Sequence, residues 1–460
     1  MQALLAIAGL TWKATLRFRL FWILAGLLLG SVILLPLLIK DDGSARGFIQ
    51  IMLTYTLSVI GTLLGLSTLW LACGIMARDI EDCQMQMVVV KPVARWQIWL
   101  GKWLGIMMVN GCLLALAGGS VYGLLIWRAH QLPAAQQEIL RNEVFVARGS
   151  IRESPPDIEG DVNRQLQRVP NFQSLPPEQQ EEARRQKREQ IKALHQVVPP
   201  NHMRKWTLDL GLRRHLLSGS TNGLAIRVKF YAADTNVSGT YLGLWQVGTP
   251  TEIKARSNPQ GLAANTFHEI GVPPNVWDEN GRLEILFENR NDTALIFPLD
   301  QDLELLYREG GFGLNYVRGL AIVFCWLALL AALGLAAASL LSFPVAAFCS
   351  ISLLVVALSS STLASVVQEG TLGGANHETG AVSVTWIDLL ILPLFRGILG
   401  VVHLIEGFSP IDSLSTGRSI TYGQVGQAFA QIVLLFGGLL AVLGIIFFSR
   451  RELATAQSNQ

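Results

Sequence analysis

Long apolar segments dominate the first and last thirds of the chain, and short polar breaks separate them. An apolar helix of about 20 residues is long enough to cross a hydrocarbon core of roughly 30 Å. Six segments have this character: 21–39, 50–77, 103–127, 314–341, 345–367 and 425–448. The pattern predicts an α-helical polytopic membrane protein with six transmembrane helices, in residues 20–127 (spans 1–3) and 313–449 (spans 4–6).

The polar residues 128–312 interrupt this pattern and predict a separate domain. Residues 128–205 are rich in Gln, Glu, Arg and Pro, which indicates a polar, partly helical segment. Residues 206–309 contain short runs of alternating apolar and polar residues, divided by turn sequences. Several short strands at this spacing are typical of an antiparallel β-sandwich, here of jelly-roll type. We therefore expect a mixed domain that ends in a β-sandwich.

Basic residues set the expected orientation. They gather in residues 1–19, in residues 77–102 and in the tail 450–460, and with six spans all three regions lie on one side. The positive-inside rule makes that side cytoplasmic, so both termini are expected there and residues 128–312 are expected outside. Residues 1–19 have an apolar stripe at helical spacing, which indicates an interfacial helix; a plain cytoplasmic flank is the alternative.

The apolar segment within residues 384–412 is ambiguous. It is nearly long enough to span, but Pro393 interrupts it and Arg396 lies near its centre. A seventh span would place the basic tail outside, so we expect a re-entrant or interfacial helical hairpin on the outer face. Arg396, His403 and Glu406 could form an outer gate there, because charge near lipid usually serves a function. Interfacial anchoring is the alternative for these three residues.

Composition supports a membrane protein and excludes several other classes. The chain is 51% hydrophobic and 15% charged, against about a quarter charged in a typical soluble domain. The net charge of +2 is too small to indicate a nucleic-acid partner. None of the five cysteines lies between residues 128 and 312, and no CxxC, HxxxH or HExxH pattern occurs. We expect neither a metal nor a cofactor in this chain.

No sequence for ATP hydrolysis is present. Lys102 follows Gly101, but Trp103 comes next and no glycine lies five residues before Gly101, so the phosphate-binding loop is absent. Nucleophiles, bases and orienting groups do not cluster at the spacing of a catalytic site. We therefore expect no enzyme activity in this chain, and energy for transport would come from a partner.

Residues 77–102 lie between the second and third spans and carry the charge that a partner could recognise. Acidic residues follow the second span, a Lys-Pro pair lies near the middle, and a new helix begins close to an Arg-Trp pair. The residues that could couple to an ATPase are Asp79, Glu81, Asp82, Lys91, Pro92, Arg95 and Trp96. An ordinary charged loop between two spans is the alternative.

This segment resembles the coupling region of type-2 ABC transporter permeases, the ABC-2 class. The residues that carry the resemblance are Glu81, Lys91, Pro92, Val93, Arg95, Trp96, Ile98, Gly101 and Lys102, whereas Cys83, Val90 and Ala94 depart from the family pattern. The resemblance implies a permease in a bacterial inner membrane, and export rather than uptake. It implies cytoplasmic ATPase subunits that hold ATP and Mg, and a second permease copy or a paralogue.

Two further expectations concern partners. Glycine pairs such as Gly101 and Gly105, or Gly119 and Gly123, allow close helix approach and could form a dimer seam. In the β-sandwich, Trp245 and Trp277 could stack on a protein or glycan ligand, but core positions are the alternative. A second class of function also stays open: a membrane-anchored assembly or mechanotransmission protein whose outer domain binds a partner without passage of substrate.

Overall fold

The structure is a computed structural model of the 460-residue chain. It describes residues 2–17, 19–38, 45–82, 93–168, 172, 176–211, 224–234, 238–299, 303–369, 386–406 and 408–451. The chain divides into two compact units. Unit 1 comprises Met1–Phe145 and Gly311–Gln460, and unit 2 comprises Val146–Gly310. The polar insertion expected at 128–312 thus begins later in the structure, because the helix that contains residue 128 continues to His130 as part of unit 1.

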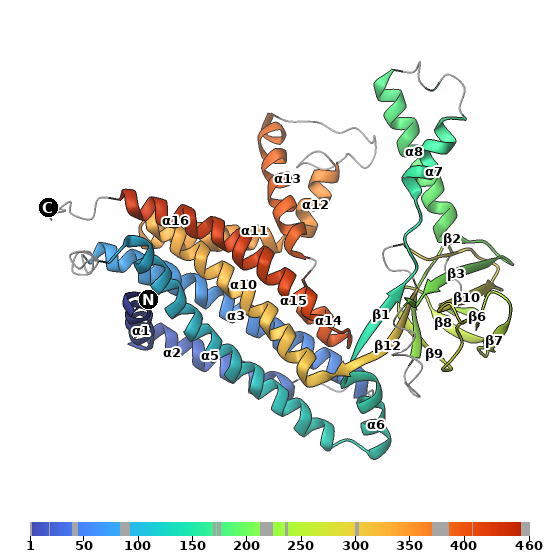
Figure 1. Cartoon of the computed structure of the whole chain (residues 1–460), viewed down its shortest axis with the longest axis horizontal. Helices are drawn as coiled ribbons and strands as arrows, with labels where there is room; N and C mark the ends of the chain where they lie inside the picture. Colours follow the sequence, from blue (N-terminus) through green and yellow to red (C-terminus); the bar gives the residue numbers. More distant parts are fainter. Residues whose placement is uncertain are drawn as a thin grey trace. The chain divides into compact units, whose positions relative to one another are not determined.

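Unit 1 is helical, and its longest helices pack around a shared apolar core (Figure 1). Helix α10 packs against α3, α5, α11 and α16, while α1 packs against α5. The helices are α1 (Gln2–Arg17), α2 (Arg19–Leu38), α3 (Ala45–Glu81), α5 (Arg95–His130), α6 (Ala134–Ile139), η1 (Leu140–Val144), α10 (Phe312–Leu340), α11 (Phe343–Leu358), α12 (Ser360–Glu369), α13 (Trp386–Glu406), α14 (Pro410–Ser415), α15 (Tyr422–Ala428), η4 (Phe429–Gly437) and α16 (Gly438–Arg450).

The expected count of six spans is wrong for the described residues. Four helices there are long and apolar enough to cross a membrane: Ile49–Glu81, Arg95–His130, Phe312–Leu340 and the continuous segment Tyr422–Arg450. A fifth is counted only if Gln2–Arg17 and Phe21–Leu35, which are bent by 75° relative to each other, form one span. The coarser prediction of a membrane-associated helical part is confirmed.

The expected span at 345–367 is divided at Ser359 into two shorter helices. Helix α11 has 16 residues, or about 24 Å at 1.5 Å per residue, which is shorter than the roughly 30 Å core. At its end the Ser359 hydroxyl donates a hydrogen bond to the carbonyl oxygen of Val355, at 3.0 Å. The same kind of bond occurs at Thr56 and Ser339 inside the continuous helices α3 and α10, so it accompanies the break at Ser359 and does not by itself cause it. The short helix α12 begins at the next residue.

Where a helical hairpin was expected within 384–412, the structure has one continuous helix. Helix α13 runs for 21 residues, with Pro393 inside it, and packs against α12. Proline removes one backbone hydrogen bond but does not reverse the chain, because the apolar residues on both sides keep helical spacing. The short helix α14 follows after residue 409.

Unit 2 is rich in β-strands, as its alternating pattern predicted. The described helices α7 (Ile158–Leu166) and α8 (Pro177–Gln196) pack against each other (Figure 1), and the buried residues of this contact are Val162, Leu166 and Ile191. The strands are β1 (Val146–Arg152), β2 (Val197–Val198), β3 (Met203–Asp209), β4 (Leu224–Lys229), β5 (Tyr231–Ala232), β6 (Thr240–Gly248), β7 (Ile253–Arg256), β8 (Gln260–Ala263), β9 (Phe267–Val272), β10 (Arg282–Asn289), β11 (Leu295–Ile296) and β12 (Glu304–Gly311).

The strands form three sheets around an aromatic core. One sheet has the order β1-β12-β4-β9, a second has the order β3-β10-β6-β7 with β8 also paired to β6, and β2-β11-β5 form a small third sheet. Trp206 and Trp245 lie 6.0 Å apart between ring centroids, and Phe287 lies 4.7 Å from Trp245. All three side chains are almost completely buried. Trp245 is therefore a core residue, while Trp277 is half-buried and packs against the same core.

Candidate functional site

The region resembling a coupling segment lies where α3 ends and α5 begins. Helix α3 ends at Glu81 and α5 starts at Arg95. Lys91 and Pro92, which were predicted to lie at the centre of this site, fall outside the described residues. The residues on either side can be placed, and they connect the ends of several helices to one another.

Arg95 begins α5, and its guanidinium group closes the end of α16. Its Nη1 atom lies 2.8 Å from the carbonyl oxygen of Phe448, 2.7 Å from that of Ser449 and 3.1 Å from that of Arg451. The last carbonyl groups of a helix have no partner inside the helix, and a cation is stabilising there. The guanidinium carbon also lies 5.9 Å from the centroid of the Phe448 ring. Arg95 therefore acts as a C-terminal cap for the last helix.

Glu81 makes the matching connection at the end of α3. One of its carboxylate oxygens accepts a hydrogen bond from the backbone N–H of Phe343, at 3.1 Å. Phe343 is the first residue of α11, where backbone N–H groups lack partners within the helix. The Phe343 ring packs edge-on against Trp70 and lies 5.1 Å from the guanidinium carbon of Arg78. The end of α3 is thus attached to the turn between α10 and α11.

A buried ion pair joins α3 to α5. The ammonium group of Lys102 pairs with the carboxylate of Asp79 and donates a hydrogen bond to the carbonyl oxygen of Ile75, at 3.2 Å. The Lys102 side chain is only 5% exposed, whereas that of Asp79 is 36% exposed. A buried ammonium group without such partners would be strongly destabilising. The carboxylate of Asp79 therefore stabilises the buried charge of Lys102.

A further contact joins α16 to α10. Arg451 donates a hydrogen bond from Nη1 to the carbonyl oxygen of Ser339, at 3.2 Å, near the end of α10. Together, five residues connect the ends of α3, α5, α10, α11 and α16, and we call them the helix-end junction: Asp79, Glu81, Arg95, Lys102 and Arg451. Three of the seven residues predicted to couple to an ATPase belong to it.

Two other predicted coupling residues point away from the protein. Asp82 is exposed, and its backbone N–H completes the last turn of α3 by bonding to the carbonyl oxygen of Arg78, at 2.7 Å. Trp96 has 47% of its surface exposed on the first turn of α5. An exposed carboxylate and an exposed indole are groups that a partner could contact directly. The structure therefore separates the predicted residues that bond to other helices, among them the exposed Glu81, from the exposed Asp82 and Trp96.

Helix α1 is held against α5 by two glycines. A Cβ atom at Gly101 would lie 2.8 Å from the side chain of Ile7, and one at Gly105 would lie 2.6 Å from that of Thr11. This pair therefore serves close packing within the chain rather than a seam between copies. In contrast, a Cβ atom at Gly123 would meet nothing within 4 Å.

The predicted outer gate residues lie on a single helix. Arg396, His403 and Glu406 all belong to α13, and the Arg396 side chain is exposed. The side chains of His403 and Glu406 lie outside the described part of the structure. The gating role of the three residues stays a prediction.

At the end of α10 opposite Leu340, polar side chains bind the segment that leads into α15. The Asn315 side chain donates to the carbonyl oxygen of Arg418 and accepts from the backbone N–H of Ile420, both at 2.7 Å. Arg318 donates to the carbonyl oxygen of Ile420 at 3.0 Å, and its guanidinium carbon lies 3.9 Å from the Tyr422 ring centroid. The start of α10 and the start of the last long helix are therefore fixed to each other.

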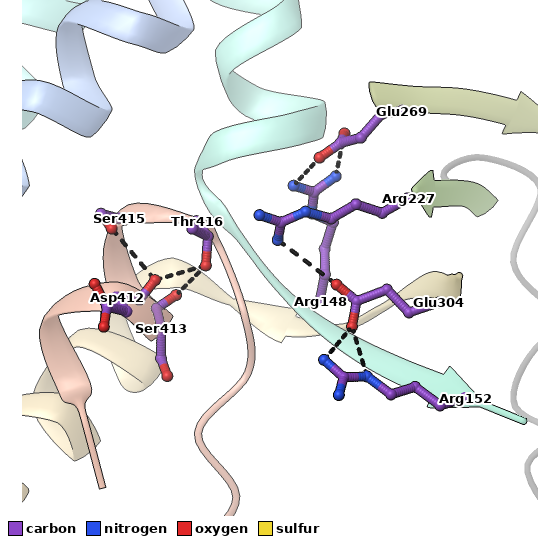
Figure 2. A network of polar contacts seen from close by, with 9 residues as sticks. All are labelled: Arg148, Arg152, Arg227, Glu269, Glu304, Asp412, Ser413, Ser415 and Thr416. Atoms are coloured by element: carbon purple, nitrogen blue, oxygen red, sulfur yellow. Dashed lines mark hydrogen bonds and ion pairs between the residues drawn. The ribbon is translucent and has the colours of Figure 1, made fainter. Parts of the chain in front are cut away.

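Unit 2 contains a row of buried charges that the sequence analysis missed (Figure 2). Glu304, Arg227 and Glu269 are directly opposite one another on β12, β4 and β9, so their side chains lie on the same face of the sheet. Arg148 forms a two-pronged contact with Glu269 at 2.8 and 3.1 Å, and Arg152 contacts Glu304 at 3.3 Å. In the sequence, each of these strands has a charged residue that alternates with residues of the aromatic core, but only the strand register shows that the charged residues align.

Among the residues that the structure describes, no group of three or more His, Cys, Asp or Glu side chains could hold a metal ion. No protein-family model, curated protein or solved structure matches this chain. The arrangement of the helix-end junction is therefore the main guide to function.

Proposed function

We propose that the chain is the permease subunit of an ATP-binding-cassette transporter of the type-2 class, energised by separate ATPase subunits that dock on residues 77–102. ATP and Mg would be held by those partners, and this chain would have no enzymatic activity. A second permease copy or a paralogue would complete the transporter in a bacterial inner membrane, with both termini in the cytoplasm. The expected direction of transport is export.

The helix-end junction is the observation that carries this proposal. Force applied to residues between Glu81 and Arg95 would reach α11 through the Glu81 cap and α16 through the Arg95 cap. The Asp79–Lys102 pair would make α3 and α5 move together. Packed helices that are bonded at their ends transmit a displacement as rigid elements rather than absorbing it. A displacement applied between Glu81 and Arg95 could thus drive several membrane helices at once.

The proposal assigns docking and transmission to different residues. Exposed Asp82 and Trp96 would contact the ATPase, while Arg95 and Glu81 would pass the movement on. The test uses the ATPase that co-purifies with the chain from its source membranes. The double substitution Asp82→Ala with Trp96→Ala should reduce co-purification by about tenfold, which corresponds to roughly 1.4 kcal/mol.

The matched variant is Arg95→Ala. This variant should co-purify with the ATPase about as well as the unchanged chain does. ATP should, however, no longer change the solvent accessibility of cysteines introduced along α16. If the two exposed residues can be replaced without loss of the ATPase, docking does not occur here. If Arg95→Ala keeps the full ATP-dependent change, the junction does not transmit it.

The strand order of unit 2 supports the finer proposal of a jelly-roll fold. We leave out β7, which pairs with β6 beside β8, and the strands of the small third sheet. With β1, β3, β4, β6, β8, β9, β10 and β12 as strands one to eight, the two larger sheets have the orders 1-8-3-6 and 2-7-4-5. A jelly roll consists of eight strands in two such antiparallel sheets. Modules of this architecture often bind glycans or proteins, which agrees with a partner on the outer side of the membrane.

One observation favours a second function. The groove between α2, α3 and α5, lined in part by Ser67, Trp70 and Asn110, has a volume of about 20 Å³. That is room for roughly one water molecule, so this groove is not itself a path for a transported substrate. In this second proposal, the helices pass ATP-driven movement to unit 2 without passage of substrate. Substrate flux in vesicles reconstituted with the ATPase supports the first function, and ATP-dependent movement of unit 2 without flux supports the second.

A further inference from the structure

Strand β3 lies at the edge of its sheet. The sheet order β3-β10-β6-β7 gives β3 a neighbour on one side only. In an antiparallel pair, alternate residues bond to the neighbouring strand and the residues between them direct their N–H and C=O groups away from it. The backbone N–H of Leu210 bonds to the carbonyl oxygen of Gly281, so the even-numbered residues of β3 face β10. Met203, Lys205 and Thr207 therefore direct their backbone groups outward.

One of these outward amides has a partner from unit 2 itself. The Thr207 N–H donates to a carboxylate oxygen of Glu153, at 2.9 Å. This contact covers one end of the edge, as proteins often do to prevent unwanted strand addition. The contact confirms the direction of the odd-numbered amides. Glu153 does not cover the outward backbone groups of Lys205 and Met203, and these two residues line a groove.

The groove next to Met203 and Lys205 has a volume of about 580 Å³, within the range of roughly 300–1,000 Å³ typical of ligand sites. Its wall opposite the strand edge includes the end of α8 and the segment after β1. Two large apolar side chains on this groove are strongly exposed, Leu194 at 76% and Met203 at 63%. Exposed apolar groups beside an open strand edge are the usual features of a peptide-binding surface.

The charges around the groove favour an acidic ligand. Arg204 and Lys205 line it, and Glu153 is the one carboxylate among the lining residues that the structure describes. The Glu153 carboxylate already accepts the Thr207 amide. Lys205 pairs with Glu284 on β10 but keeps 53% of its side chain exposed. A strand with carboxylates would meet complementary charge here, and a basic strand would be repelled.

We propose that this groove binds an extended, acidic peptide segment of a partner protein, which adds as a strand beside Met203–Lys205. The backbone groups of Met203 and Lys205 supply the main-chain hydrogen bonds, Leu194 and the Met203 side chain contact an apolar residue of the peptide, and Arg204 and Lys205 attract its carboxylates. The inference concerns unit 2 alone, so it goes beyond both proposed functions and holds whichever of them is correct.

The test uses the full-length chain in lipid nanodiscs and three fluorescein-labelled heptapeptides, in which valine alternates with glutamate, threonine or lysine. Fluorescence polarisation should give a dissociation constant for the glutamate peptide about tenfold lower than for the lysine peptide. Hydrogen exchange at Met203 and Lys205 should slow by about tenfold when the glutamate peptide is saturating. Slower exchange at these two amides distinguishes strand addition from simple ionic attraction to side chains.

Substitutions at Lys205 separate the contribution of its backbone N–H to binding from that of its side-chain charge. Lys205→Pro removes an outward N–H that the sheet does not use, so the strand should still form, and binding should weaken by about tenfold or more. Lys205→Ala removes only the charge and should weaken binding less. Lys192→Ala, at an exposed basic residue of α8 outside the groove, should change nothing. Unchanged exchange protection in β10 shows that each variant is folded.

Several results would overturn the proposal. Absence of binding by any of the three peptides excludes the site, and equal binding of the glutamate and lysine peptides excludes charge recognition. Full binding by Lys205→Pro excludes strand addition. If light scattering instead shows that the chain self-associates through this edge and that Lys205→Pro abolishes the association, the occupant is a second copy and the proposed partner peptide is wrong.

Discussion

Replacing Arg95 with alanine should loosen the end of the last helix. The Nη1 atom carries two hydrogens, so it can satisfy at most two of the three carbonyl oxygens near it at one time. Hydrogen bonds to charged groups contribute about 1.5–3 kcal/mol each, but Arg95 is half-buried and solvent would replace part of the loss. We expect Arg95→Ala to cost about 2 kcal/mol of local stability, which is a factor of roughly 30 in the equilibrium for local opening.

Hydrogen exchange at the backbone amides of residues 445–451 measures this opening. Exchange there should become about 30-fold faster in Arg95→Ala, while exchange in the middle of α10 should be unchanged. Arg450→Ala is the matched control, because Arg450 is an exposed basic residue at the same helix end. If both variants accelerate exchange equally, Arg95 acts only through its positive charge near the helix end, and the capping argument is refuted.

Three further changes test other contacts. Gly105→Val should separate α1 from α5 and lower the melting temperature, whereas Gly123→Val, at a position with open space, should not; equal effects would contradict the packing argument. Asp79→Asn should cost about 3–5 kcal/mol because it leaves the buried Lys102 ammonium group without its carboxylate partner, and adding Lys102→Met should recover part of the loss; additive losses would mean that the two side chains do not interact. Glu304→Gln should destabilise unit 2 by about 3–5 kcal/mol in urea unfolding because it leaves buried arginine charge, and a loss below about 1 kcal/mol would mean that solvent reaches the charges.

The apolar pattern predicted helices well but their number poorly. Hydrophobicity reports that a segment avoids water, and this was enough to place the four long helices. It does not report where a helix is interrupted. The break at Ser359 is a local change in backbone conformation inside an apolar segment, and averaging hydrophobicity over about 20 residues conceals it.

The coupling residues show a similar division. The sequence pattern placed charge at both ends of residues 77–102, and the structure places Asp79, Glu81 and Arg95 at one end of the helix bundle. The sequence pattern could not distinguish the role of Arg95 from that of Trp96. The first makes internal contacts and the second is exposed, because adjacent residues on a helix point in directions about 100° apart and only the packing of neighbouring helices decides which direction is inside.

The sequence by itself determined that this chain has a membrane-compatible helical part and a β-rich part, because periodicity and composition are local properties. Only the tertiary structure decided what its charged residues contact. Arg95 bonds to a carbonyl group 353 residues away, and Glu304 meets Arg227 only through the register of two strands. Such contacts depend on how distant segments align in space. No local pattern contains that information, and the proposed function rests on it.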